Sequence, residues 1–230
     1  MCGRFTLKTP PDQWVQLLLP IANLAEIKSS WQPRYNIAPT QNIVAFAMND
    51  QQEIIADYYR WGLIPSWATD LSIGSRMINA RSETLQEKRS FKGPLAKRRC
   101  LIVADGYYEW QKRSDGSKQP HWIHPTDADS DEPHPLILFA GLWEHNRRAT
   151  NHPIRSCTII TTAANSHLEP IHDRMPAILS GQAAQRWLSD DCTVEEAQAF
   201  LQPAPPTLLR AQSVSTHVNN ARHEDPNCLK

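Results

Sequence analysis

The second residue of the chain is the first candidate for chemistry. The sequence opens Met1-Cys2-Gly3-Arg4, and removal of an initiator Met before a small residue would leave Cys2 at the N-terminus. That residue would carry a thiol and a free α-amine, whose ordinary pKa values of about 8.5 and about 8 leave both partly nucleophilic near neutral pH. Such a pair condenses with an aldehyde to an imine, which the thiolate closes into a five-membered thiazolidine. Alternatively, the thiol attacks an acyl carbon, as in hydrolases with an N-terminal nucleophile, or Cys2 is only part of a disordered chain end.

Two ionisable side chains stand in settings that suit proton transfer. Glu109 follows the apolar run 100–104 and a turn, and its neighbours are tyrosine and tryptophan. Removal of a carboxylate from water raises its pKa, and a Glu so tuned can act as a general acid or base near neutral pH. Alternatively, Glu109 occupies the polar face of a strand. His172 lies between two prolines and directly precedes Asp173 and Arg174, a setting that core packing hardly explains.

Amide and cationic side chains gather in the middle of the chain. Asn79 and Arg81 precede a predicted helix start capped by Ser82, where an Arg beside backbone N–H groups would form an anion site. The segment 88–99 that follows is the most basic of the chain. A charge run of this kind is usually a solvated face, but its position beside Asn79 and Arg81 also favours contact with phosphate.

Aromatic and amide residues mark two further loops. The segment W-G-L-I-P-S-W-A at 61–68 is broken by Gly and Pro, so Trp61 and Trp67 lie on a loop or at its edges. A tryptophan there either closes the side of the core or offers a face on which a nucleobase stacks. The polar segment 34–40 is expected to be turn-like, and Asn36 within it is either a turn former or a site residue beside its Arg and Tyr neighbours.

Composition limits the classes of function. The 230 residues carry zero formal net charge, so no global field draws the protein to DNA or to an anionic membrane, and nucleic-acid binding has to rest on a local cluster of arginine and aromatic residues. The five cysteines are odd in number, widely spaced and without a C-x-x-C pair, which argues against a disulfide framework and against a zinc site. No signal peptide or membrane-spanning run is evident, and we expect a cytosolic protein without a metal or cofactor.

The elements that would position these residues are mostly strands. Eight Trp and 18 Pro favour a sheet-rich fold, and apolar patterns predict strands over 43–48, 53–61, 100–104, 119–124, 136–143, 154–162 and 208–214. Short helices are predicted over 12–19, 180–188 and 193–201. Residues 126–135 are acidic and rich in proline, and a solvated insertion is expected there because the Gly and terminal Glu of a calcium loop are missing. The polar residues 221–230 are expected to form a loose tail.

Six motifs follow one another along the chain: M-C-G-R-F, R-Y-N-I-A-P, W-G-L-I-P-S-W, I-N-A-R-S-E-T, A-D-G-Y-Y-E-W and I-H-D-R-M-P. Together they run from residue 2 to residue 176 and resemble the SRAP family, the SOS response-associated peptidase domain of abasic-site-shielding proteins. With the terminal helices and strand, the likeness covers nearly the whole chain, so we expect a single domain over 1–230. The resemblance implies an α+β fold with a twisted, mainly antiparallel, barrel-like β core and peripheral helices.

The resemblance also implies a chemistry. Family members bind single-stranded DNA at an abasic site, whose ring-opened sugar exposes an aldehyde, and their N-terminal Cys forms a thiazolidine crosslink that shields the lesion. By motif position, Cys2 matches the nucleophile and Asn79 matches the residue that orients the sugar. Glu109 matches the proton-transfer group and His172 the active-site histidine.

Further positions match contacts with DNA in the family. They are Arg4, Arg81, Arg174 and Trp67, and Asn36 is added as a candidate from its place in R-Y-N-I-A-P. The chain departs from the family at one point, because a second aromatic residue often follows Trp67 and here the residue is Ala68. That change weakens stacking at this place and leaves the chemistry untouched.

Three functions remain open on these grounds. The resemblance favours covalent processing of abasic sites in single-stranded DNA, a crosslinking or lyase-type activity in which removal of Met1 is autocatalytic or is left to another enzyme. The alternative enzyme is a thiol peptidase that acts on itself or on peptides, with Cys2 as nucleophile and His172 as base. The third is a DNA-binding module without chemistry. The expected partners are single-stranded DNA with abasic sites and the replication machinery, for a monomer in the cytoplasm that joins the nucleoid when bound to DNA.

Overall fold

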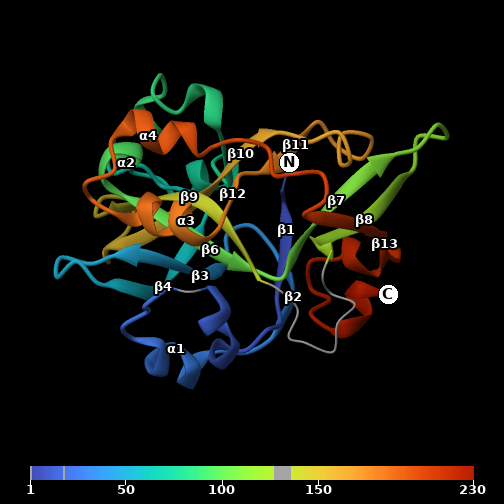
Figure 1. Cartoon of the computed structure of the whole chain (residues 1–230), viewed down its shortest axis with the longest axis horizontal. Helices are drawn as coiled ribbons and strands as arrows, with labels where there is room; N and C mark the ends of the chain where they lie inside the picture. Colours follow the sequence, from blue (N-terminus) through green and yellow to red (C-terminus); the bar gives the residue numbers. More distant parts are fainter. Residues whose placement is uncertain (1, 18, 127–135) are drawn as a thin grey trace.

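The apolar strands of the sequence close into a barrel. The computed structural model describes residues 2–17, 19–126 and 136–230. Within them β3 (Asn42–Met48), β4 (Ile54–Trp61), β6 (Arg99–Ala104), β9 (Ile137–Asn146) and β10 (Ile154–Ala163) pair in the order β10-β4-β3-β6-β9, and β9 pairs again with β10 (Figure 1). These pairings are antiparallel except for β10 with β4. All six residues of β6 are buried, as expected of a strand with a continuous apolar pattern.

Three short strands extend the barrel along β9 and β10. β5 (Asn79–Arg81) runs parallel to β10, β11 (Arg174–Pro176) runs antiparallel to β10, and β12 (Ile178–Leu179) pairs with β9. On β10, Thr161 pairs with Arg81, and Ala163, two residues further on, pairs with Arg174. Segments almost a hundred residues apart therefore carry their arginines to neighbouring places on the sheet.

A second, antiparallel sheet packs against the barrel. Its strand order is β13-β8-β7-β1-β2, with β1 (Arg4–Leu7), β2 (Arg34–Ile37), β7 (Gly106–Lys112), β8 (Lys118–Pro125) and β13 (Leu209–Ser213). Aromatic rings join the two layers. Phe5 lies edge-on to Trp61 at 5.3 Å between ring centroids, and Phe5 and Tyr107 lie 6.1 and 5.9 Å from Phe139. The core that supports the start of β1 is thus built from both sheets.

The helices are short and lie at the periphery (Figure 1). They are α1 (Leu24–Ser30), α2 (Arg89–Lys97), α3 (Gly181–Leu188) and α4 (Val194–Ala199), with 3₁₀ turns η1 (Pro11–Leu17), η2 (Leu71–Arg76), η3 (Ser82–Thr84), η5 (Thr216–Asn219) and η6 (Pro226–Leu229). Among the described residues no helix has the length and apolar character needed to cross a membrane. The α+β fold with a mainly antiparallel, barrel-like core is as predicted.

Several local predictions differ from the structure. The segment 34–37, expected to be a turn, is the edge strand β2, because its backbone groups find partners on β1. The helix expected to begin at Ser82 is a single 3₁₀ turn, so Arg81 has no helix N-terminus beside it. Of the predicted acidic insertion at 126–135, residues 127–135 lie outside the described residues.

The C-terminal segment is anchored rather than loose. The Glu224 carboxylate accepts hydrogen bonds from the backbone N–H groups of Tyr35 and Asn36, at 2.5 and 2.8 Å, and from Arg34 Nε at 2.9 Å. Cys228 is fully buried. The expectation of a loose tail over 221–230 therefore fails, because one carboxylate satisfies the open N–H groups of an edge strand.

Candidate active site

Cys2 is part of the packed core at the start of β1. The residue has no exposed surface, and its carbonyl oxygen accepts a hydrogen bond from Asn79 Nδ2 at 2.8 Å. Burial raises the pKa of the thiol, and the negative charge of Glu109 raises it further. A disordered chain end is excluded as the setting of Cys2, and a base is needed nearby to make its thiolate.

Glu109 supplies a titratable carboxyl beside Cys2. The register of β1 with β7 pairs Arg4 with Tyr108, so one step beyond the strand Gly3 faces Glu109. The side chain is only 3% exposed, and burial, with a further contribution from the charge of Asp173, raises the pKa of Glu109 to about 7. A place on a solvated strand face is therefore excluded, and the carboxyl can give or take a proton near neutral pH.

His172 lies beside the same site in a neutral form. Its Nδ1 accepts the backbone N–H of Arg174 at 3.0 Å, and a carboxylate oxygen of Asp173 lies 2.8 Å from the same atom. Burial lowers the pKa of His172, although Asp173 opposes the shift. The two contacts call for opposite protonation of Nδ1, since the N–H of Arg174 needs an acceptor and the Asp173 carboxylate needs a donor.

Asn79, Arg81 and Arg174 lie on β5 and β11, on either side of β10. Asn79 Oδ1 is buried and has no hydrogen-bond partner among the described residues. Arg81 is exposed. Arg174 instead holds Glu83 through two hydrogen bonds of 2.6 and 2.9 Å and the carbonyl of Thr161 at 2.6 Å. A phosphate at Arg174 would have to share the guanidinium with Glu83.

Arg4 and Asn36 belong to one hydrogen-bond network with the C-terminal segment. Arg4 Nη1 donates to Asn36 Oδ1 at 2.8 Å and to the carbonyl of Val218 at 2.9 Å, and Nη2 donates to the carbonyl of Asn219 at 3.4 Å. Asn36 Nδ2 lies 2.9–3.2 Å from the carbonyls of residues 218, 220 and 223, and the side chain has no exposed surface. Asn36 thus orders the surroundings of Arg4, and its contact with DNA stays a prediction.

The two loop tryptophans have different settings. Trp61 is fully buried and donates from Nε1 to the carbonyl of Ile78 at 2.9 Å, so it closes the core. Trp67 is 40% exposed, and the guanidinium of Arg89 lies 5.5 Å from its ring centroid. Asn146 Nδ2 holds this loop through the carbonyls of Pro65 and Ala68, at 2.6 and 2.8 Å. An open aromatic face on a fixed loop is available for stacking.

The family model for the SOS response associated peptidase (SRAP) matches residues 1–221. The chain belongs to the SRAP family. It is 40% identical to the abasic site processing protein YoqW of Bacillus subtilis (strain 168), over all of this chain and 99% of the relative. It is 34% identical to the abasic site processing protein HMCES of Gallus gallus, over 86% of this chain and 66% of that protein.

Solved structures show the same SRAP fold. A protein from Bacteroides thetaiotaomicron superimposes with a TM-score of 0.85 at 24% identity, over all of this chain and 99% of the other. A phage-related protein from Bordetella bronchiseptica gives a TM-score of 0.71 at 29% identity, over 93% of this chain and 94% of the other. The arrangement of barrel and second sheet is therefore shared with experimentally determined structures.

Further residues near Cys2 in this SRAP chain are not evident from the sequence. An open hollow of about 400 Å³ is lined by Gly3, Arg4, Trp110, Lys118 and Asn219. The guanidinium of Arg4 lies 5.9 Å from the Trp110 ring, whose Nε1 donates to Asn219 Oδ1 at 2.7 Å. The alternation of side chains along a strand was the signal that could have indicated the position of Trp110. Trp110 follows Glu109 directly, so its side chain points to the opposite face of β7.

Tyr107 is a second missed neighbour. It lies two residues before Glu109, on the same face of β7, and is fully buried. Its hydroxyl has no hydrogen-bond partner among the described residues. Burial raises the pKa of Tyr107, and the charges of Glu109 and Cys2 raise it further, so the three groups share one environment.

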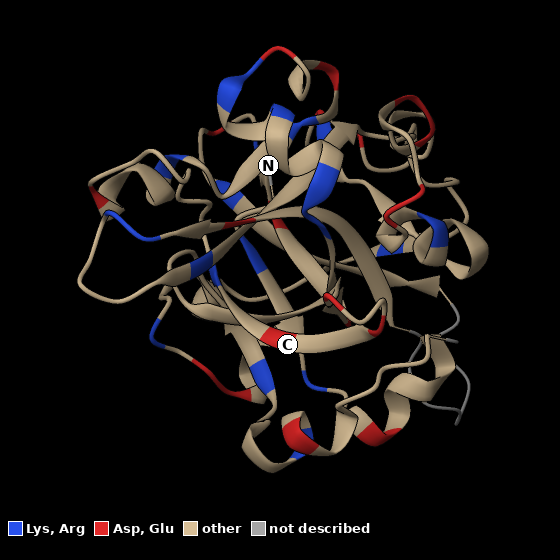
Figure 2. Cartoon of the chain, turned by 90° about the vertical axis from the view of Figure 1, so that its left-hand side faces the viewer, with Lys and Arg blue, Asp and Glu red and all other residues tan. Residues whose placement is uncertain are grey.

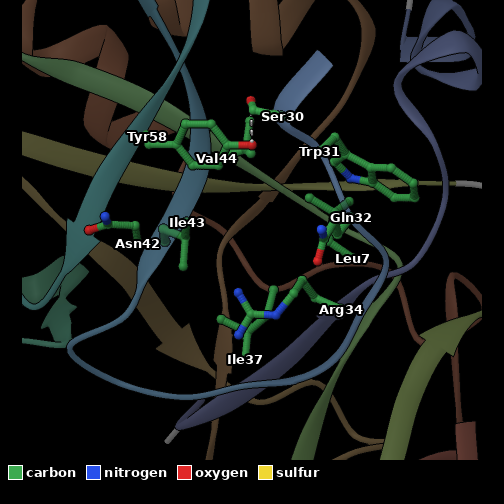
Figure 3. A pocket seen from close by; sticks show the side chains of 10 residues that line it. All are labelled: Leu7, Ser30, Trp31, Gln32, Arg34, Ile37, Asn42, Ile43, Val44 and Tyr58. Atoms are coloured by element: carbon green, nitrogen blue, oxygen red, sulfur yellow. Dashed lines mark hydrogen bonds between the residues drawn. The ribbon is translucent and has the colours of Figure 1, made fainter. Parts of the chain in front are cut away.

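A separate cavity of about 170 Å³ opens near Leu7, at the end of β1 away from Cys2 (Figure 3). It is lined by Leu7, Ser30, Trp31, Gln32, Arg34, Ile37, Asn42, Ile43, Val44 and Tyr58. The Arg34 side chain extends toward Ile37 in Figure 3, and its guanidinium is already bound to Glu224. None of the predicted site residues lines this cavity, so the chemistry is sought around Cys2.

Proposed function

We propose that this SRAP protein binds abasic sites in single-stranded DNA and forms a thiazolidine crosslink through Cys2 after removal of Met1. The observation that carries the proposal is the enclosure of Cys2 by two groups suited to the reaction. Asn79 holds its carbonyl at 2.8 Å, and the Glu109 carboxyl has a pKa raised by burial to about 7. The names of the relatives, abasic site processing proteins, supply the substrate class.

The chemistry needs two proton transfers that one carboxyl can serve. The α-amine of Cys2 adds to C1′ of the open sugar, and protonated Glu109 gives a proton to the departing hydroxyl, so that water leaves and a protonated imine forms. The resulting carboxylate then takes the thiol proton as the sulfur adds to the imine carbon. One water is lost overall, and Glu109 ends as it began. Its pKa of about 7 suits both steps.

Neighbouring side chains orient the sugar. Asn79 Oδ1, buried without a partner among the described residues, accepts from a hydroxyl of the open sugar in this proposal. The imidazole of His172, whose pKa is lowered by burial, contacts a sugar oxygen or the adjacent phosphate in this proposal. These contacts place C1′ against the amine, and positioning of this kind accounts for much of an enzymatic rate.

The DNA strand follows local cation and aromatic groups, since the protein has no net charge. Basic and acidic positions are interspersed over the view of Figure 2. Exposed Arg81 offers a contact to a phosphate, and the open ring of Trp67 offers a face on which a base can stack. The hollow with Arg4, Trp110 and Lys118 begins at Gly3, the residue after Cys2, and would continue the path of the strand. Arg174 can contact a phosphate of the strand once its hydrogen bonds to Glu83 are broken.

The cellular role follows from this reaction. A covalent cap on an abasic site would shield it during replication, with the replication machinery as partner. We propose that the protein acts as a monomer in the cytoplasm and is associated with the nucleoid when bound to DNA.

Intact mass spectrometry with a single-stranded oligonucleotide that carries one abasic site tests the proposal. The expected product is the protein without Met1 plus the oligonucleotide mass less one water, and Cys2→Ala should not form it. A protein that lacks Met1, keeps Cys2 intact and yet gives no adduct would rule out aldehyde capture. Cleavage of a peptide that depends on Cys2 and His172 would then favour the thiol peptidase that the family description names, and binding without chemistry would favour the plain DNA-binding module.

A further inference from the structure

Three side chains of metal-binding types meet in the C-terminal segment. They are His217 on η5, Asp225 just before η6, and Cys228 on η6. One ligand atom from each lies within 4.8 Å of the other two. His217 Nε2 and Asp225 Oδ2 are 3.0 Å apart. The lack of a C-x-x-C pair argues against zinc in the sequence, but here the turn between η5 and η6 brings together residues spaced His-x7-Asp-x2-Cys.

The donor set suits zinc more than other common ions. Imidazole nitrogen, thiolate sulfur and carboxylate oxygen are the three ligand types of protein zinc sites, at about 2.0–2.3 Å from the metal. Donor atoms around such a centre lie roughly 3–4 Å apart, so a separation of at most 4.8 Å closes with small side-chain movements. A buried thiol excludes calcium and magnesium as preferred occupants, because these ions take oxygen ligands.

Surrounding contacts already orient two of the three donors. Asp225 Oδ1 accepts the backbone N–H of Asn227 at 2.8 Å, which leaves Oδ2 facing His217. The His223 ring stacks on His217 at 3.9 Å between centroids, which fixes the plane of the imidazole. Cys228 is fully buried, whereas the side chains of His217 and Asp225 are 32% and 41% exposed. An ion can enter from the solvent side and meet the thiol last.

We propose that His217, Asp225 and Cys228 form a zinc site with three protein ligands and one position left to solvent or a further donor. Binding releases the thiol proton, and His217 binds as the neutral imidazole. The charges of thiolate and carboxylate then balance those of Zn²⁺, so that the ion replaces the existing His217–Asp225 pair without leaving a net charge in the segment.

Zinc here would act on the candidate active site through the main chain. Val218 and Asn219, which follow His217 directly, give their carbonyl oxygens to Arg4, two residues after Cys2. A bound ion would join η5 to η6 and so hold this segment against Arg4. The zinc site does not depend on the proposed crosslinking chemistry, and its test can be read without DNA.

The experiment uses the full chain as Cys2→Ala, because an N-terminal cysteine binds zinc by itself. Titration with Zn²⁺, read by native mass spectrometry and calorimetry, should give one ion per chain. Free zinc at about a hundredfold above its Kd should raise the Tm by roughly 5–10 °C, as expected for a ligand that binds only the folded chain of this size. Added to this background, His217→Gln and Cys228→Ser should each weaken zinc binding at least tenfold.

Matched controls decide the assignment. Cys192→Ser in the same background changes another buried cysteine outside the cluster and should keep the zinc affinity. His217→Gln alters a half-exposed side chain, so it remains readable if Cys228→Ser does not fold. No zinc bound to the Cys2→Ala protein, or equal affinity in the His217→Gln and Cys192→Ser variants, would overturn the site.

Discussion

Replacement of Glu109 by Gln tests the electrostatics and the chemistry of the site together. The side chain is 3% exposed, and burial raises its pKa from the ordinary 4.5 to about 7. At about 1.4 kcal/mol for each pH unit, this difference corresponds to about 3 kcal/mol. The ionised form of Glu109 is therefore less favourable in the folded protein than in the unfolded chain by about that amount.

The sign of the pH dependence follows. Because the folded pKa is the higher one, the folded protein holds this proton more tightly, and the stability that the proton contributes is present below about pH 4.5 and lost as the pH rises through about 7. Glutamine stays neutral throughout. We expect Glu109→Gln to be more stable than the wild-type protein by up to about 3 kcal/mol above pH 7, and the difference to vanish toward pH 4.5.

Urea denaturation followed by tryptophan fluorescence, from about pH 5 to about pH 8, measures this difference in the free energy of unfolding. A difference that stays constant with pH would refute the assigned pKa.

The same variant should form the crosslink more slowly, by about 10²- to 10⁴-fold, which is the usual contribution of general acid–base catalysis. The component of the wild-type pH dependence that is centred near pH 7 should be absent from Glu109→Gln. Time courses on denaturing gels give formation and reversal, while affinity for an undamaged strand serves as the control. Unchanged rates in both directions would refute the catalytic role.

Three further substitutions test the DNA path and the C-terminal anchor. Arg81→Ala should weaken binding to undamaged single strands in a salt-dependent way, with the slope of log K against log salt reduced by about 0.7; equal affinity at low salt would remove Arg81 from the path. Trp67→Leu should cost about fivefold or more in affinity by fluorescence anisotropy, whereas Val15→Ala, at the more exposed apolar position, should change nothing. Glu224→Gln should lower the free energy of unfolding by about 1–3 kcal/mol in thermal denaturation, because charged hydrogen bonds to β2 are lost; a loss no larger than that of Glu195→Gln on the exposed face of α4 would contradict the anchor.

Predictions succeeded where neighbours in the sequence decide the outcome. The raised pKa of Glu109 could be predicted because the buried strand and the aromatic residues around it are adjacent in the chain. The exposure of Trp67 and the burial of Trp61 could not be told apart, because Asn146, far along the chain, fixes their loop. The strand β2 was mistaken for a turn because its partners on β1 lie about thirty residues away.

Residues of the C-terminal segment were the least predictable. Glu224 reads as one polar residue in a polar tail, and nothing nearby indicates that it binds β2, almost two hundred residues earlier. The meeting of His217, Asp225 and Cys228 is equally hidden, since their spacing matches no common metal motif. The family motifs nominate the candidate site residue by residue, and these assignments stay predictions, whereas the Trp110 hollow required the fold.

The hydrogen bonds from Arg4 to residues 218 and 219 set an order of events during synthesis. At about 5–20 residues per second, roughly 10–40 s pass between the synthesis of Cys2 and that of these partners. In that interval the start of β1 lacks the contacts that later hold it. On the nascent chain Cys2 is not yet packed into the core that later buries it, and we expect an external methionine aminopeptidase to act in that interval. Self-removal of Met1 would need the completed site, so the age of a chain at which Met1 disappears distinguishes the two routes.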